Sequence, residues 1–270
     1  MESIARLYGI RQAAVSARRN QPVLAVQPQH TNWGGTAHGG CFILLSTLAC
    51  QNVSHETTYG GTYTYHFLRS VPVGDTMTAS AKVTKAGRVL LCAQADIMSE
   101  GRLVGFMTAD SILKSAQVTN IADRQTGQTP PPIDCLMPTL TKDSTTRERR
   151  LLGCMGSKET FFSRPHENVS CVGLATNEDY TDSSGWLDDA IFGCLADNSL
   201  GLTCCSRGID CVTTCLTVTI LKKARPGALL RCNAEVVLES GPFLTACGTL
   251  WADNRIVGTC EGTFYGFQPQ

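Results

Sequence analysis

The sequence contains an internal repeat, and this feature limits the possible folds more than any other. Three pairs of segments match in the same order along the chain: Ala37–Ala49 with Leu187–Ser199, Phe67–Gly74 with Ile220–Gly227, and Gly101–Gly105 with Asn254–Gly258. The first pair is offset by 150 residues and the other two by 153, so a small change in loop length accounts for the difference. Matched motifs in a constant order predict a tandem duplication of one domain.

Each half shows the same predicted order of elements, one apolar helix followed by four strands. The helices are expected at about 41–52 and 189–203, and the strands at 61–69, 75–85, 88–99, 102–114, 211–222, 228–238, 243–252 and 255–267. Short connections with Gly or Pro favour hairpins, and hence an antiparallel sheet. The helices are apolar on nearly every face, which predicts that they are buried. The predicted fold class is α+β, with two tandem hotdog domains that form a pseudo-dimer.

The length of the chain and its polar middle predict the domain boundaries. We expect an N-terminal hotdog domain at 1–116, a linker at 117–150 that contains three consecutive prolines, and a C-terminal hotdog domain at 151–270. Residues 1–20 are basic and carry one acid. They could form a mitochondrial presequence or a helix that leads into the first domain, and we favour the helix. The expected location is therefore the cytoplasm or the mitochondrial matrix.

Composition excludes several classes of function. The formal net charge is zero, so a nucleic-acid partner is not expected. No apolar run reaches the ~18 residues of a membrane span. The 14 cysteines are scattered without Cys-x-x-Cys pairs, which favours buried thiols in a reducing compartment over disulfides or a metal site. The cations Lys222, Lys223 and Arg225 at a strand end are expected on a solvated face.

The two helices differ at the positions where chemistry is expected. The first begins with His38-Gly39-Gly40 and has Thr47 nine residues after the histidine. The second lacks this motif but has Asp197 at the position equivalent to Thr47. The first half therefore has the His-Gly-Gly motif without the aspartate, and the second half has the aspartate without the motif. This complementarity predicts a single composite site across the joint between the halves.

A family resemblance rests on these residues. The His-Gly-Gly motif at 38–40, the apolar helix behind it and the Leu-Ala-Asp-Asn motif at 195–198 resemble the hotdog acyl-CoA thioesterases of the phenylacetate-pathway and thioesterase superfamily member type. The resemblance is strongest over 187–267 and weaker over 32–114. It implies hydrolysis of an acyl-CoA thioester, with coenzyme A entering only as part of the substrate. It also implies no metal, and a homo-oligomer of the chain.

The chemistry of thioester hydrolysis fits two of these positions. Unpaired backbone amides at a helix N-terminus suit a developing oxyanion, so Gly39 is the expected donor, with Gly40 beside it. Asp197 lies on an apolar helix, where burial would raise its pKa and make it a better base. It would act either as a general base for water or as a nucleophile, and the sequence leaves both roles open.

Five further residues complete the predicted site. Asn32 lies where the family often has an Asn that fixes the water or the carbonyl. Thr213 lies where the family often has a hydroxyl that orients the water, with Thr214 as a close alternative. His38 is expected to lock the turn before the helix, and Phe42 is expected to line the substrate tunnel.

The second joint between the halves is expected to be inactive. Its base position holds Thr47, which is a poor base at neutral pH. Its oxyanion position holds Asp188-Asp189, whose carboxylates would repel an oxyanion, and its hydroxyl position holds Gly60.

Two other functions remain open from the sequence. One is a hotdog acyl-thioester dehydratase or hydratase, in which a His and a carboxylate move a proton and water across a carbon–carbon bond. The other is a non-catalytic acyl-CoA-binding protein. The complementary set of Asn32, Gly39, Asp197 and Thr213 favours hydrolysis over both.

Overall fold

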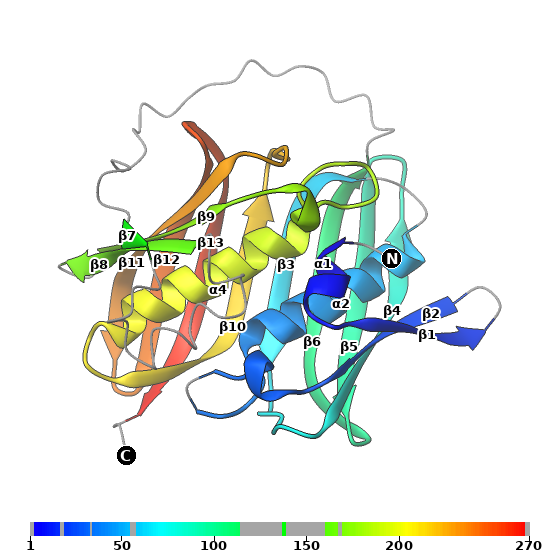
Figure 1. Ribbon diagram of the computed structural model, residues 1–270, viewed down its shortest axis with the longest axis horizontal. Coiled ribbons are helices and arrows are strands. Elements are labelled where there is room, and N and C mark those ends of the chain that lie inside the picture. The colour runs from blue at the N-terminus through cyan, green and yellow to red at the C-terminus, as the bar shows by residue number, and fades with distance from the viewer. Residues whose placement is uncertain are drawn as a thin grey trace.

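The computed structural model describes residues 3–16, 19–32, 34–54, 58–113, 137–138, 160–166 and 169–267. Its main feature is one antiparallel sheet of thirteen strands that curves around two long helices, α2 (Gly39–Val53) and α4 (Asp189–Cys205) (Figure 1). The two halves of the chain form the two halves of this sheet, each with its own long helix.

The remaining elements have the following bounds. The N-terminal half contributes α1 (Ser3–Leu7), the 3-10 turn η1 (Pro28–His30), β1 (Arg11–Ser16), β2 (Arg19–Ala25), β3 (Thr58–Phe67), β4 (Thr76–Ala86), β5 (Leu90–Ser99) and β6 (Arg102–Leu113). The rest of the chain contributes β7 (Met137–Pro138), β8 (Thr160–His166), β9 (Val169–Ala175), the turn η4 (Glu178–Tyr180), β10 (Asp210–Ile220), β11 (Leu229–Ser240), β12 (Phe243–Ala252) and β13 (Arg255–Phe267). Both predicted helices and all eight predicted strands are present, each within three residues of its expected bounds.

The order of the strands reveals a pseudo-twofold axis. The sheet runs β1-β2-β4-β5-β6-β3-β10-β13-β12-β11-β9-β8-β7, so β3 and β10 meet at its centre and each half repeats the same order outward. In this register Thr64 of β3 lies opposite Thr217 of β10, and the 153-residue repeat relates the same two residues. The axis therefore passes between them, where their hydroxyls lie 3.2 Å apart.

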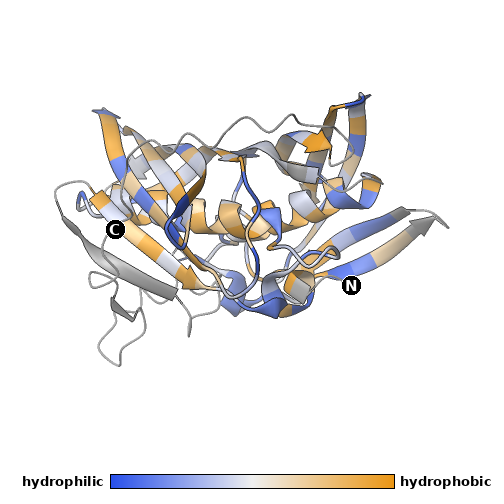
Figure 2. Ribbon diagram, turned by 90° about the horizontal axis from the view of Figure 1, so that it is seen from above, coloured by the Kyte–Doolittle hydropathy of each residue, from blue (hydrophilic) through white to orange (hydrophobic). Residues whose placement is uncertain are grey.

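The two long helices form the centre of the core. Apolar side chains surround both helices, and in Figure 2 the helices lie inside the curve of the sheet, coloured mostly as apolar. They pack closely where Gly193 of α4 meets α2. A Cβ at Gly193 would lie 2.8 Å from Ile43 Cγ2 and 3.4 Å from the Tyr65 hydroxyl, so glycine is required for this contact.

The structure corrects one expectation at the N-terminus. Residues 1–20 were expected to form a helix, but the described part has only the short α1, followed by the hairpin of β1 and β2. This hairpin extends the sheet through the pairing of β2 with β4. Most of the predicted linker at 117–150 lies outside the described residues, and the domain boundaries remain a prediction.

Candidate functional site

A cavity of about 360 Å³ lies at the first joint, between the start of α2 and the middle of α4. It is lined by residues from both halves, among them Asn32, His38, Gly39, Phe42, Asp197, Thr213 and Thr214. Seven of the eight predicted site residues therefore line one cavity. The sequence prediction that the site would be built from both halves agrees with this placement.

The start of α2 is fixed by His38, which is its N-cap residue. The Gly40 amide donates to His38 Nδ1 at 3.0 Å, and the His38 amide donates to the carbonyl of His30 at 2.8 Å. Burial lowers the pKa of His38, although nearby Asp197 raises it in part. A neutral ring that accepts through Nδ1 carries its proton on Nε2. The Gly40 amide is thus used within the cap, and Gly40 does not line the cavity.

Gly39 presents its backbone to the cavity. Among the hydrogen bonds of the described residues, none uses the Gly39 amide. The carboxylate of Asp197 lies directly against its Cα, so that a Cβ at this position would overlap Asp197 Oδ2. The unpaired amide lies at the positive end of the helix dipole and can polarise a carbonyl. The carboxylate from the other half lies beside it and can act as a base on the same substrate.

Asp197 is a buried carboxylate on an apolar helix. Its side chain is 5% exposed, and the Thr213 hydroxyl donates to Oδ1 at 2.8 Å. Its Oδ2 atom lies 3.7 Å from His38 Nδ1, which is too long for a hydrogen bond. Burial raises the pKa of Asp197, while His38 and the Thr213 hydrogen bond each lower it in part. The result is a carboxylate that binds a proton more readily than an exposed aspartate does.

A β-bulge in β10 determines that the hydroxyl of Thr213, and not that of Thr214, reaches Asp197. The bulge follows Thr213 directly. In the rest of the strand alternate residues such as Leu216 face the helices, so strict alternation would turn Thr214 toward them. The inserted residue reverses this alternation. Thr213 therefore reaches Asp197, and the Thr214 hydroxyl donates to the carbonyl of Thr263 at 2.9 Å instead.

Asn32 and Phe42 occupy the walls of the cavity. Asn32 Oδ1 accepts from the amide of Thr36 at 3.3 Å and from its hydroxyl at 3.4 Å, which leaves the Nδ2 group for a ligand. Phe42 is 4% exposed and packs edge-on against Phe67, with ring centroids 5.6 Å apart.

Sequence reasoning missed much of the apolar wall. The missed lining residues are Phe67, Leu68, Gly201, Cys205, Cys211, Val212, Phe264 and Tyr265. A signal was available for two of them, because Gly201 and Cys205 follow Asp197 at intervals of four residues on α4 and so share its face. The strand residues gave no such signal, since their place at the cavity depends on the pairing of β10 with β13.

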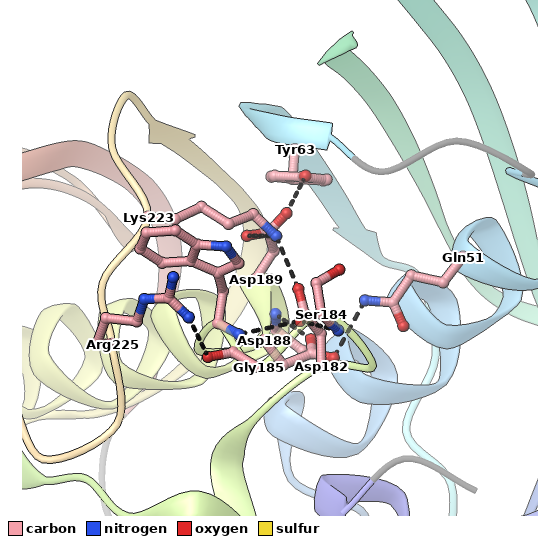
Figure 3. Close-up of polar contacts among 11 residues, drawn as sticks. Gln51, Tyr63, Asp182, Ser184, Gly185, Asp188, Asp189, Lys223 and Arg225 are labelled. Atoms are coloured by element: carbon pink, nitrogen blue, oxygen red, sulfur yellow. Dashed lines mark hydrogen bonds and ion pairs between the residues drawn. The ribbon is translucent and has the colours of Figure 1, made fainter. Parts of the chain in front are cut away.

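The second joint holds a polar network in place of this site (Figure 3). Asp188 is the N-cap of α4, and its Oδ1 accepts from the Ala190 amide at 2.9 Å. Its Oδ2 accepts from Gln51 of the other half at 3.1 Å. Asp189 stands at the position equivalent to Gly39, so a carboxylate is present where the first joint has an unpaired amide.

Asp189 is bound by groups that the sequence did not point to. The Tyr63 hydroxyl donates to its Oδ2 at 2.6 Å, and Lys223 Nζ lies 3.2 Å from its Oδ1 and 3.1 Å from Asp182 (Figure 3). Lys223 was expected on a solvated face, and that prediction is wrong, because its side chain is 9% exposed. Burial alone would lower the pKa of Lys223, but Asp189, Asp182 and Asp188 raise it, so the ammonium stays charged.

Thr47 and Gly60 occupy the other two positions at which the second joint was expected to lack catalytic groups. The Thr47 hydroxyl lies 3.2 Å from the hydroxyl of Tyr65, so it is part of the core. Gly60 has no hydroxyl and lies against the carbonyl of Ile220, where a Cβ would overlap. The cavity at this joint is smaller, about 220 Å³, and the carboxylates of Asp182 and Asp189 line it.

Two negative findings apply to the part of the chain that the structure describes. No helix there is long and apolar enough to cross a membrane. No group of three or more His, Cys, Asp or Glu side chains there could hold a metal ion.

Comparison with known proteins agrees with this architecture. Residues 34–106 match the model of the thioesterase superfamily. A conserved hot dog-fold protein of unknown function from Alicyclobacillus acidocaldarius superposes with a TM-score of 0.72 at 16% identity, covering 100% of both chains. Acyl-CoA thioesterase II TesB2 from Mycobacterium marinum gives a TM-score of 0.67 at 12% identity, covering 99% of this chain and 98% of that one.

The tesB protein of Mycobacterium avium subspecies paratuberculosis gives a TM-score of 0.65 at 11% identity, covering 95% of this chain and 96% of that one. No curated protein matches the sequence. Similarity over the full length of these structures shows that the chain is a tandem double hotdog. Its first hotdog domain carries the thioesterase superfamily pattern.

Proposed function

We propose that the protein hydrolyses acyl-CoA thioesters to the free acid and coenzyme A at the composite site of the first joint. The observation that carries this proposal is the contact between the Asp197 carboxylate and the Gly39 backbone, two groups from different halves, within one cavity. The thioesterase superfamily match of residues 34–106 supports the same class of chemistry.

In this proposal Gly39 polarises the thioester carbonyl. Its amide is at the positive end of the α2 dipole, and the glycine lets the substrate approach the backbone closely. Negative charge develops on the carbonyl oxygen as water attacks, and a fixed donor stabilises that charge without reorganisation. Asn32 lies on the same wall and offers its Nδ2 group as a second donor.

Asp197 acts as the general base for water. Thr213 holds one carboxylate oxygen, Oδ1, and leaves Oδ2 toward Gly39 and the cavity. Oδ2 takes a proton from water as the water oxygen bonds to the thioester carbon. The tetrahedral intermediate then collapses, the carbon–sulfur bond breaks, and the proton passes from Asp197 to the departing thiolate of coenzyme A.

Paired substitutions at equivalent positions of the two helices test the proposal. Asp197→Asn removes the base and should reduce release of free coenzyme A from acyl-CoA by at least ~10²-fold. Thr47→Val changes the equivalent position of the other helix and should leave the rate within a factor of about three. Thiol release followed with a chromogenic disulfide measures both. Similar activity in the two variants would contradict the assignment of Asp197.

One observation favours a second candidate, an acyl-thioester hydratase. His38 and Asp197 lie 3.7 Å apart, and a histidine with a carboxylate is the pair that such chemistry uses. The first candidate is preferred because His38 Nδ1 already accepts from Gly40 as the cap of α2. Saturated acyl-CoA separates the two, since a hydrolase releases coenzyme A from it and a hydratase leaves it unchanged.

A further inference from the structure

The cavity at the first joint has a polar end and an apolar end. Asn32, Thr36, Arg69 and Ser70 form the polar end, around the loop before α2 and the turn between β3 and β4. The apolar end is formed by Gly201, Cys205, Cys211 and Phe264, which lie next to one another. Phe42 and Phe67 pack together on the α2 side of the cavity. A substrate with a polar carrier and an apolar acyl group therefore has one favourable orientation.

Helix α4 provides a continuous wall along the apolar end. Asp197, Gly201 and Cys205 all line the cavity and follow one another at intervals of four residues. Residues at this spacing lie on one face of a helix. At a rise of ~1.5 Å per residue, Cys205 lies about 12 Å along the helix from the reacting carboxylate. We call this wall, from Asp197 through Gly201 to Cys205, the α4 groove.

Gly201 keeps the α4 groove open. A glycine in a helix interior costs about 1 kcal/mol of stability relative to alanine, so its presence needs a reason. At Gly193 the reason is close packing against Ile43. At Gly201 an added Cβ would meet only Phe264 Cε1, at an ordinary 3.7 Å, so packing does not require glycine there. The space that a side chain would fill belongs to the cavity.

Two cysteines end the groove. Cys205 and Cys211 are both buried, and their Sγ atoms lie 3.4 Å apart, joining the end of α4 to the start of β10. A route between the two long helices is blocked, because Gly193 and Ile43 are in direct contact there. For an acyl chain that begins at Asp197, the α4 groove offers a path toward Cys205 inside the cavity.

We propose that the α4 groove binds the acyl chain and selects medium-chain substrates of about eight to ten carbons, the extended length that fits ~12 Å. This inference rests on the proposed function and adds the substrate class. The cavity volume agrees with it. The whole cavity, with its polar end included, has a volume of about 360 Å³, which corresponds to about twelve groups the size of a water molecule, so a chain of this length fits and a much longer one does not.

Two variants with opposite expected effects test this inference. Gly201→Val places a branched side chain in the middle of the groove, and Cys205→Ala removes a sulfur from its end. The wild type and both variants are assayed with saturated acyl-CoA substrates of four to sixteen carbons, and kcat/KM is measured for each length. Binding of free fatty acids of the same lengths is measured by calorimetry, which needs no turnover. Thermal unfolding checks that each variant is folded.

The expected results are specific. The wild type should prefer eight to ten carbons. Gly201→Val should lose at least tenfold in kcat/KM on the ten-carbon substrate, and its loss on the four-carbon substrate should be clearly smaller. Cys205→Ala should move the optimum toward longer chains. If Gly201→Val fails to fold, Gly201→Ala replaces it, and a several-fold loss confined to the longer chains is expected.

The two proposals fail in different ways. Hydrolysis with a chain-length profile that neither variant changes would overturn the α4 groove and leave the hydrolase standing. Fatty-acid binding with the expected profile and shifts, but without hydrolysis of any acyl-CoA, would support the groove and overturn the hydrolase.

Discussion

The hydroxyl of Thr213 controls how readily Asp197 ionises. It donates to Asp197 Oδ1 at 2.8 Å, and this bond lowers a pKa that burial has raised. In the proposed mechanism Asp197 must be ionised to accept a proton from water, so activity is expected to fall as pH drops through the pKa of Asp197. Because Thr213→Val removes a donor to the charged form, it raises that pKa and should move the acid limb of kcat/KM to higher pH.

Thr214→Val is the matched control for this prediction. It removes a neighbouring hydroxyl whose hydrogen bond goes to the Thr263 carbonyl. The acid limb of this variant should coincide with that of the wild type. An acid limb that moves to lower pH in Thr213→Val would contradict the assigned role.

Asp197 also has an expected effect on stability. Its pKa in the folded protein is raised by burial, so the folded state binds a proton more tightly than the unfolded state does. Ionisation therefore destabilises the fold as pH rises above the unfolded value of ~3.9. At pH 7, Asp197→Asn should be more stable than the wild type by on the order of 1 kcal/mol, an exchange of stability for function.

The pH dependence of the stability difference between Asp197→Asn and the wild type shows whether ionisation of Asp197 causes it. Urea unfolding of the wild type and Asp197→Asn at pH 7 and at pH 4 gives the free energy of unfolding of each. The difference should shrink at pH 4, where the carboxyl is protonated in both states for much of the time. A wild type that is the more stable protein at pH 7 would show that the carboxylate stabilises the fold.

At the scale of elements, the start of α4 depends on a buried cation. Lys223 lies 3.2 Å from Asp189 and 3.1 Å from Asp182, and all three side chains are largely buried. Removing one partner of a buried ion pair leaves an uncompensated charge, which typically costs about 3–5 kcal/mol. Lys223→Met should reduce the free energy of unfolding by that order.

Denaturant unfolding measures this loss of stability. A control variant and a double variant show whether the loss comes from the buried ion pair. Arg88→Met removes an exposed cation from the β4–β5 turn and should change the free energy of unfolding by less than about 0.5 kcal/mol. Adding Asp189→Asn to Lys223→Met should recover part of the loss, since it removes the stranded charge. Equal stability of Lys223→Met and the wild type would mean that the network is not structural.

The elements also show which parts of the fold a single sequence reveals. Alternating apolar residues predicted the eight main strands, and the apolar runs predicted α2 and α4. Strands β1, β2, β7, β8 and β9 were missed. The first two read as a basic, alanine-containing segment. The β1–β2 and β8–β9 hairpins join the main sheet through β4 and β11, which are distant in the chain, so their place depends on tertiary pairing. The same dependence on tertiary contacts explains the error at Lys223, whose burial follows from Asp182 and Asp189.

At the scale of the whole molecule, the repeat explains why the two joints differ. The pseudo-twofold axis between Thr64 and Thr217 relates Gly39 to Asp189 and Thr47 to Asp197. In a homodimer every substitution appears at both joints. In this chain each joint can change by itself, and one joint has the unpaired Gly39 amide beside the Asp197 carboxylate while the other has the polar network. The predicted homo-oligomer of the chain stays a prediction.

The pairing of β3 with β10 has a consequence for how the protein behaves in dilute solution. That pairing is internal to one chain, so bringing α2 to α4 is a unimolecular step whose equilibrium does not depend on concentration. Activity per mole of chain should therefore stay constant from micromolar to picomolar protein, as measured by initial rates over a dilution series. A fall in specific activity on dilution would show that a second chain completes the site.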